Sequence, residues 1–145
     1  MNHLELKSIL LVDDDESTNF INKVFINKLN LDIQVNTTLN GKEALSFLEK
    51  DKAYGENVSF VTPCLLILDI NMPIMDGWEF LEAYEQKFNK EFKDKIIIVM
   101  VTISKDEKYE IEANNNSNVS EYIQKPLSDV KFEGIINKYF LEKQL

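Results

Sequence analysis

Short apolar runs alternate along the chain with longer stretches of helical spacing, and this alternation limits the fold more than any other feature. Five runs have the character of strands: Ser8–Val12, Ile33–Thr37, Cys64–Leu68, Ile96–Thr102 and Glu121–Ile123. The three central runs are nearly continuous in apolar residues, which is typical of strands buried on both faces. They are also short for buried helices.

The stretches between these runs carry apolar residues at helical spacing. The positions that define five expected helices are Phe20, Val24, Phe25 and Leu29; Ala44, Leu45 and Leu48; Trp78, Leu81, Tyr84 and Phe88; Ile111; and Ile135, Ile136, Tyr139 and Phe140. Trp78 and the phenylalanines are expected in the core. This alternation predicts an α/β fold, in which helices cover both faces of a five-stranded parallel sheet.

Length and composition favour one domain. The 145 residues, 44 % of them hydrophobic, suffice for a single core. We expect one domain over residues 1–145, with its core at about 7–143 and no effector domain. Asp51–Pro63 is long for a connection, and Tyr54–Asn57 is expected to form a surface loop.

Charge and hydropathy exclude two classes of partner. The net charge is −9, and all 16 basic residues are lysine, whereas nucleic-acid readers usually carry a basic patch with arginine. No stretch approaches the roughly 18 apolar residues that a membrane span needs, and the first residues do not resemble a signal peptide. We expect a cytoplasmic protein that binds neither nucleic acid nor membrane.

Polar and charged residues follow four of the predicted strands. They are the Asp13–Asp15 run, Asp69, Thr102 and Lys125. Ligands of an open parallel sheet bind at the carboxyl ends of its strands, so these residues are expected to converge on one edge. Asp15 is expected to serve the turn itself, near a helix N-terminus.

The residue types in this cluster suit phosphoryl transfer. Clustered carboxylates repel one another unless a cation relieves the repulsion, and oxygen ligands favour Mg²⁺, with Mn²⁺ as the alternative, over Zn²⁺. A carboxylate such as Asp69 can attack phosphorus. Lys125 and Thr102 supply a positive charge and a hydroxyl for the oxygens of the transferred group.

Four segments carry a resemblance to a known family. They are Ile9–Glu16, Leu66–Gly77 with its Asp-x-x-Met-Pro-x-Met-Asp-Gly pattern, Val101–Thr102 and Tyr122–Pro126. In order and spacing they resemble the CheY-like receiver domain of response regulators, here in a stand-alone, single-domain form. The resemblance covers nearly the whole chain and implies a three-layer, doubly wound sheet in the order 2-1-3-4-5.

The resemblance also implies roles at the metal site. Asp69 would be the phosphoacceptor and a ligand of Mg²⁺. Asp13 and Asp14 would belong to the metal site, with Asp14 as the direct ligand, and the main-chain carbonyl of Asn71 would complete the protein ligands.

Further roles concern the switch. Lys125 would pair with Asp69 before phosphorylation and with the phosphoryl group afterwards, and the peptide before Pro126 would be cis. Thr102 would move toward the phosphoryl group and Tyr122 would reposition in response. The face of the fourth helix, fifth strand and fifth helix would then change its affinity for a downstream protein.

The donor is expected to be another protein. His3 is the only histidine and lies in a terminal tail, so a sensor histidine kinase or histidine phosphotransfer protein would act in trans. The protein would be a switch and not an enzyme beyond its own phosphotransfer and slow autodephosphorylation. We expect a monomer, with phosphorylation-linked dimerisation as the alternative.

Some positions depart from the family pattern. Ile103 stands where Ala or Gly is usual and would narrow access to the phosphate; Ser104 and Asn71 occupy positions that tune its lifetime in relatives. Asn114–Asn118 replaces the usual Gly-Ala before the fifth strand and is expected to cap the fourth helix, where asparagine tolerates the left-handed conformation. Pro73 and Gly77 are expected to shape the loop after Asp69.

Three other functions compete with this interpretation. A receiver-like interaction module without phosphorylation is the runner-up, although it need not retain Asp14, Asp69, Thr102 and Lys125 together. A phosphohydrolase of the haloacid-dehalogenase type would need an acid two residues after its nucleophile, where this chain has Asn71. A flavodoxin would need a Ser/Thr-rich loop after the first strand.

Overall fold

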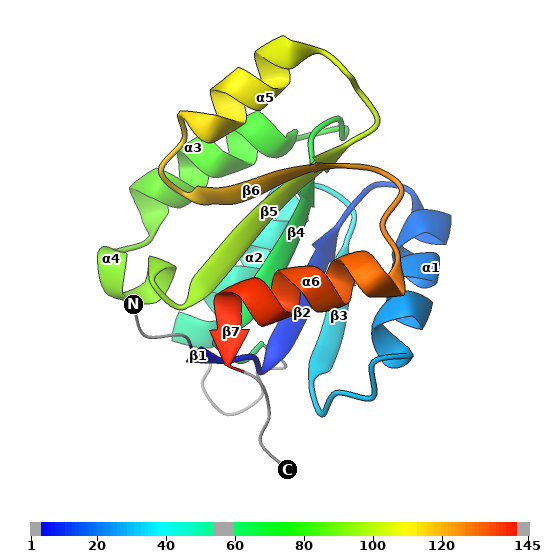
Figure 1. The fold of residues 1–145 in the computed structure, drawn as a ribbon. Helices are drawn as coiled ribbons and strands as arrows, with labels where there is room; N and C mark the ends of the chain where they lie inside the picture. The colour runs from blue at the N-terminus through cyan, green and yellow to red at the C-terminus, as the bar shows by residue number, and fades with distance from the viewer. Residues whose placement is uncertain (1–3, 54–59, 142–145) are drawn as a thin grey trace.

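A five-stranded parallel sheet forms the centre of the molecule (Figure 1). The computed structural model describes residues 4–53 and 60–141. The strands of the sheet are β2 (Ser8–Val12), β3 (Gln34–Thr38), β4 (Cys64–Asp69), β5 (Ile96–Thr102) and β6 (Val119–Gln124). Their order is β3-β2-β4-β5-β6, which confirms the predicted 2-1-3-4-5 order, since a short β1 precedes these five strands.

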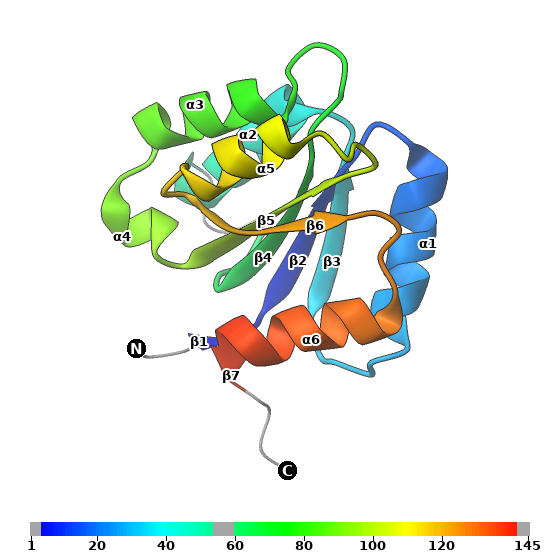
Figure 2. The ribbon, with the colours of Figure 1, turned by 45° about the horizontal axis from the view of Figure 1, so that its top comes forward.

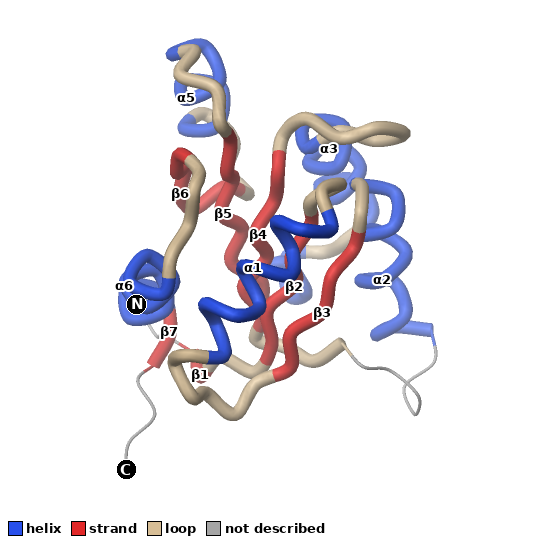
Figure 3. Tube along the Cα trace, turned by 90° about the vertical axis from the view of Figure 1, so that its right-hand side faces the viewer, coloured by secondary structure: helices blue, strands red, loops and turns tan. Residues whose placement is uncertain are grey.

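Helices cover both faces of this sheet (Figures 2 and 3). One face carries α1 (Glu16–Asn27) and α6 (Asp129–Tyr139). The other carries α2 (Gly41–Ala53), α3 (Gly77–Lys87), the short α4 (Lys90–Lys93) and α5 (Glu107–Asn114). The three-layer architecture therefore agrees with the expectation from the sequence.

The central strands are buried on both faces, as their apolar runs predict. Every residue of β2 and β4 is buried, and β5 is buried except at Ile97. Side chains alternate across the sheet, so successive residues enter two separate cores. The edge strands β3 and β6 are polar and only partly buried.

Several short elements were not predicted. β1 (Leu4–Glu5) pairs in parallel with β7 (Phe140–Leu141), and α4 adds one turn after α3. Elements of two to four residues are too short to produce a hydrophobic period. The loop expected at Tyr54–Asn57, and His3, lie outside the described residues.

Helix α1 turns only part of the predicted face to the core: Phe25 and Leu29 pack against it, as expected. Phe20 is 68 % exposed and Val24 40 % exposed, whereas Asn19, Asn22 and Ile26 are buried. Residues 19, 22 and 26 also follow a helical spacing, and they lie on the same side of the helix as Phe25 and Leu29. The expectation that all phenylalanines lie in the core is therefore wrong for Phe20.

The asparagine-rich stretch forms the connection between α5 and β6. Asn115 caps α5 with ordinary right-handed dihedral angles, so the left-handed conformation expected there is not used. The side chain of Asn116 instead accepts a hydrogen bond from the amide of Asn118 (3.0 Å).

In the described part of the chain, no helix has the length and apolar character of a membrane span.

Candidate functional site

The carboxyl ends of the parallel strands bring the predicted residues to one edge. Asp13 follows β2 directly, Asp69 is the last residue of β4, Thr102 is the last of β5, and Lys125 follows β6. β4 lies beside both β2 and β5 in register, so Asp69 has the other two strand ends on either side.

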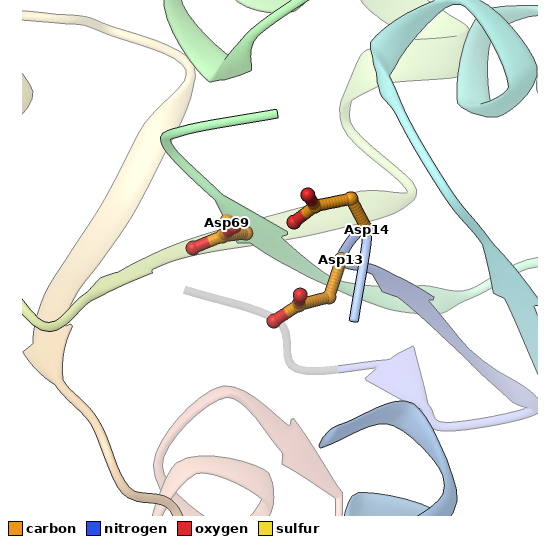
Figure 4. Close-up of side chains that lie close together, drawn as sticks. All are labelled: Asp13, Asp14 and Asp69. Carbon is orange, nitrogen blue, oxygen red and sulfur yellow. The ribbon is translucent and has the colours of Figure 1, made fainter. Parts of the chain in front are cut away.

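Three carboxylates form a tight cluster at this edge. Asp13, Asp14 and Asp69 each place an oxygen within 4.8 Å of the others (Figure 4). Asp13 is 5 % and Asp69 7 % exposed, whereas Asp14 is exposed. The cluster is therefore buried at Asp13 and Asp69 and open to solvent at Asp14.

Lys125 supplies the positive charge beside these acids. Its Nζ lies 2.6 Å from Oδ2 of Asp13 and 3.1 Å from Oδ1 of Asp69. Burial alone would lower the pKa of Lys125, but the hydrogen bond to Asp13 and the charge of Asp69 outweigh it, and the pKa is raised. Lys125 is thus a firmly held cation, and the peptide that joins it to Pro126 is cis, as expected.

The surroundings of Asp69 raise the pKa of its carboxyl group. Burial, and then the charge of Asp13, raise its pKa to about 6, although Lys125 acts in the opposite direction. One lysine therefore does not neutralise the cluster. A divalent cation would relieve the remaining repulsion, and three oxygen donors at this spacing fit a hard ion such as Mg²⁺.

The turn Asp13–Asp15, called the acid turn below, is held by three hydrogen bonds around Asp13. The Asp13 amide donates to the carbonyl of Thr38 (3.1 Å), and Oδ1 of Asp13 accepts from the amide of Asp15 (2.9 Å). The side-chain amide of Asn19 donates to the Asp13 carbonyl (2.9 Å). Asp15 caps α1 by accepting from the amide of Ser17, which fits the turn role expected for it.

The loop after Asp69 packs closely against the strand end. The amide of Gly77 donates to the carbonyl of Ile70 (2.8 Å), and a Cβ at Gly77 would come within 2.7 Å of the Asp69 carbonyl oxygen. Only glycine fits there without a shift of the backbone. Asn71 is exposed two residues after Asp69, and Ile74 adopts a left-handed φ of 69°.

Thr102 and Tyr122 lie on the two strands beyond Asp69. Thr102 is buried, and its hydroxyl accepts a hydrogen bond from the amide of Ser104 (3.1 Å). The hydroxyl of Tyr122 is buried without a hydrogen-bond partner in the described part of the chain. Burial, and then the charges of Glu110 and Asp106, raise the pKa of Tyr122.

Comparison with known proteins decides the family. The profile described as the response regulator receiver domain matches residues 9–137. The chain belongs to the response regulator receiver domain family. It is therefore related to signalling switches of two-component systems and not to conventional enzymes.

Individual relatives of this receiver domain agree with the assignment. The response regulator Rcp1 of Synechocystis sp. is 30 % identical over 113 residues, which cover 74 % of this chain and 73 % of Rcp1. A probable C4-dicarboxylate response regulator, DctR, of Halalkalibacterium halodurans is 26 % identical over 131 residues. These cover 90 % of this chain but 50 % of DctR, so the chain spans about half of that relative.

Solved receiver structures show the same fold. A two-component response regulator from Cytophaga hutchinsonii superposes with a TM-score of 0.76 at 29 % identity. The alignment covers 93 % of this chain and 97 % of that one.

Ile103 extends an apolar surface beside the site of this receiver domain. It is 78 % exposed and, with residues of α1, lines a hollow of about 300 Å³ next to Lys125. The other apolar residues of this hollow are Ile21, Phe25, Pro126 and Leu127. The expectation that Ile103 narrows access to a phosphate stays a prediction.

Sequence reasoning missed the residues that hold the acid turn. Thr38 contributes only its backbone carbonyl, which leaves no signal in the sequence. No role is predicted for Asn19 from the sequence, because the apolar spacing of Phe20 and Val24 indicates a different inner face. Asn19 lies at helical spacing from Asn22 and Ile26, and this spacing is the signal that would have placed Asn19 on the buried side of the helix.

Proposed function

We propose that Asp69 accepts a phosphoryl group from a phosphohistidine of a separate protein. The observation that carries the proposal is the pairing of Asp69 with Lys125 inside a three-carboxylate cluster at the carboxyl edge of the sheet. Membership of the receiver family supports it. The proposal concerns a switch in signal transduction, with no sustained turnover of a substrate.

The chemistry begins with the Asp69 carboxylate. With a pKa of about 6, most Asp69 side chains are ionised at pH 7 without help from a base. An oxygen of Asp69 attacks phosphorus, a carboxyl–phosphate bond forms, and the bond from phosphorus to the donor's imidazole nitrogen breaks. The electron pair of that bond returns to the imidazole.

The metal site is proposed from the same residues. Asp14, Asp69 and the main-chain carbonyl of Asn71 would hold Mg²⁺, with Asp13 beside them and paired to Lys125. Bound there, Mg²⁺ would neutralise charge on the transferred phosphoryl oxygens. The open side of the cluster at Asp14 leaves room for the water ligands that Mg²⁺ usually keeps.

Lys125 and Thr102 would respond to the new phosphate. Lys125 is already 3.1 Å from Asp69 and would transfer its ion pair to a phosphoryl oxygen. Thr102 would give up its contact with the Ser104 amide and donate to another oxygen. Tyr122, whose hydroxyl has no hydrogen bond in the described structure, would then change position on β6.

The downstream protein would bind the face formed by α5, β6 and α6. These elements lie beyond β5 at one side of the sheet, and β6 connects directly to Lys125. We place a downstream protein on this face and a sensor kinase or phosphotransfer protein at the acidic cluster. We also place the protein in the cytoplasm, where such donors present their phosphohistidines.

A labelling experiment tests the proposal. The protein is incubated with Mg²⁺ and either acetyl phosphate or phosphoramidate, whose P–N bond resembles that of phosphohistidine, and its intact mass is measured. We expect one phosphoryl adduct on the wild type and on the control Asp32→Asn, which removes an exposed carboxylate just before β3, at the amino end of that strand and not at the carboxyl edge of the sheet. Asp69→Asn should give none. An adduct that survives Asp69→Asn, or no adduct with either donor, would refute the proposal.

A further inference from the structure

Asp14 lies in the acidic cluster without support for its own side chain. Its carboxylate makes no hydrogen bond or ion pair within the described residues, yet one of its oxygens lies within 4.8 Å of oxygens of Asp13 and Asp69. The backbone of the acid turn therefore determines where this carboxylate stands. Whatever fixes the peptide between Asp13 and Asp14 also fixes the cluster.

Asn19 is the one side chain from outside the turn that contacts this peptide among the described hydrogen bonds. From the first turns of α1, its Nδ2 donates to the carbonyl oxygen of Asp13 at 2.9 Å. Asn19 is 4 % exposed, so the contact is shielded from water. A buried hydrogen bond of this kind resists rotation of the carbonyl because the alternative leaves both groups unpaired.

The position is otherwise unfavourable for asparagine. Its Oδ1 is buried without a hydrogen-bond partner within the described residues, and asparagine is a weak helix former. Leucine, of similar size, would suit both the helix and the apolar core against which α1 packs. It would, however, leave the Asp13 carbonyl without its donor.

We propose that Asn19 is a positioning residue for the acidic cluster, acting through the Asp13 carbonyl to hold Asp14 opposite Asp69. This inference rests on the proposed function, in which Asp14 and Asp69 bind Mg²⁺. Mg²⁺ demands near-ideal octahedral geometry, so a small displacement of one carboxylate weakens binding. Outer partners of metal ligands typically contribute about 10- to 100-fold in metal affinity.

Asn22 offers a matched control on the same helix. It is a second buried asparagine, one turn after Asn19, and it makes no hydrogen bond to the acid turn. Asn19→Leu and Asn22→Leu therefore make the same chemical change at similar burial. Only the first removes the donor to Asp13.

The test measures Mg²⁺ binding by calorimetry without a phosphodonor, and then the Mg²⁺ dependence of labelling by acetyl phosphate. We expect Asn19→Leu to raise the dissociation constant and the half-saturating Mg²⁺ concentration about tenfold or more, with much of the rate restored at saturating Mg²⁺. Asn22→Leu should stay within about twofold of wild type. Equal Mg²⁺ affinity of Asn19→Leu and wild type, or equal shifts in both variants, would overturn the proposal.

A second variant covers a failure to fold. If circular dichroism shows Asn19→Leu unfolded, Asn19→Ala replaces it with the same expectation for Mg²⁺ affinity. If both are unfolded while Asn22→Leu folds, Asn19 is a structural residue and the proposal is overturned. A wild type that binds Mg²⁺ but takes no phosphate would refute the phosphoacceptor function and leave the calorimetric comparison valid.

Discussion

Asp69 shows how one residue combines two opposing requirements. It must be buried beside other acids to bind a cation and a phosphoryl group, but that burial raises its pKa to about 6. In the folded protein without metal, the ionised form of Asp69 is therefore destabilised by its surroundings. Three predictions at the scale of residues follow from this conflict and from the carboxylates around it.

Replacing Asp69 by asparagine should stabilise the metal-free protein. The pKa of Asp69 in the folded protein exceeds its unfolded value of 3.8, so protonation of Asp69 stabilises the folded state. This stabilisation is fully present below about pH 4 and is lost as the pH rises through about 6. At pH 7.5 we expect Asp69→Asn to raise the free energy of unfolding by about 1–2 kcal/mol, after allowance for solvent screening.

Urea denaturation in EDTA at pH 7.5 and at pH 4 measures this difference. The gain should shrink toward zero at pH 4, where the wild-type carboxyl is already neutral. A gain of equal size at both pH values would show that charge at Asp69 is not the cause.

Mg²⁺ affinity should depend on pH through the same group. Binding requires an ionised Asp69, and a pKa of about 6 implies that affinity falls about tenfold between pH 7.5 and pH 5. Isothermal titration calorimetry at the two pH values checks this. A fall of less than about twofold would contradict the raised pKa.

The ion preferred by the cluster can be tested by stability. Mg²⁺ should raise the melting temperature more than Ca²⁺ at equal concentration, because the proposed site, with two carboxylates, one carbonyl and an open side at Asp14, suits an ion that keeps several water ligands. Thermal melts in each chloride salt, at fixed ionic strength, provide the comparison. Equal shifts, or a larger shift with Ca²⁺, would disprove this preference.

At the scale of elements, α1 illustrates what periodicity leaves open. The helix itself was predictable, but its buried residues are Asn19, Asn22 and Ile26, whereas Phe20 is exposed. The contact between Asn19 and the Asp13 carbonyl accompanies this burial. A contact that spans a strand and a helix leaves no periodic trace in the sequence.

The orientation of α1 predicts that truncation of an exposed side chain and of a buried side chain will change stability by different amounts. Phe20→Ala should change the free energy of unfolding by less than about 0.5 kcal/mol because the ring is exposed. Ile26→Ala, in the core of the same helix, should cost about 2–5 kcal/mol. Chemical denaturation of both variants measures the contrast, and a larger loss at Phe20 would mean that α1 packs through the face first expected from the sequence.

Tyr139 and Tyr122 of the proposed output face have opposite surroundings. The Tyr139 hydroxyl on α6 donates to Glu121 of β6 (2.6 Å), whereas the Tyr122 hydroxyl has no partner among the described residues. Because only Tyr139 joins a helix to the edge strand by its hydroxyl, the two residues should respond differently to its removal.

Tyr139→Phe should lower the free energy of unfolding by about 1 kcal/mol, while Tyr122→Phe should change it by less than about 0.5 kcal/mol or raise it. Denaturation curves of the two variants provide the measurement. A loss at Tyr122 comparable with that at Tyr139 would show that its hydroxyl is bonded.

At the scale of the whole molecule, the parallel sheet explains why so much of the site was readable in advance. Apolar runs located β2, β4 and β5, and parallel geometry then placed Asp13, Asp69 and Thr102 at one edge. The pairing of β1 with β7 was not predictable, because two-residue strands carry no pattern and their contact joins opposite ends of the chain.

The central claim is that a phosphoryl group resides on Asp69. After incubation with Mg²⁺ and acetyl phosphate, reduction with borohydride converts an aspartyl phosphate to homoserine, which peptide mass spectrometry can locate. We predict Mg²⁺-dependent homoserine at residue 69 and at no other aspartate. Homoserine at Asp13 or Asp14, or its absence from residue 69 under labelling conditions, would contradict the account.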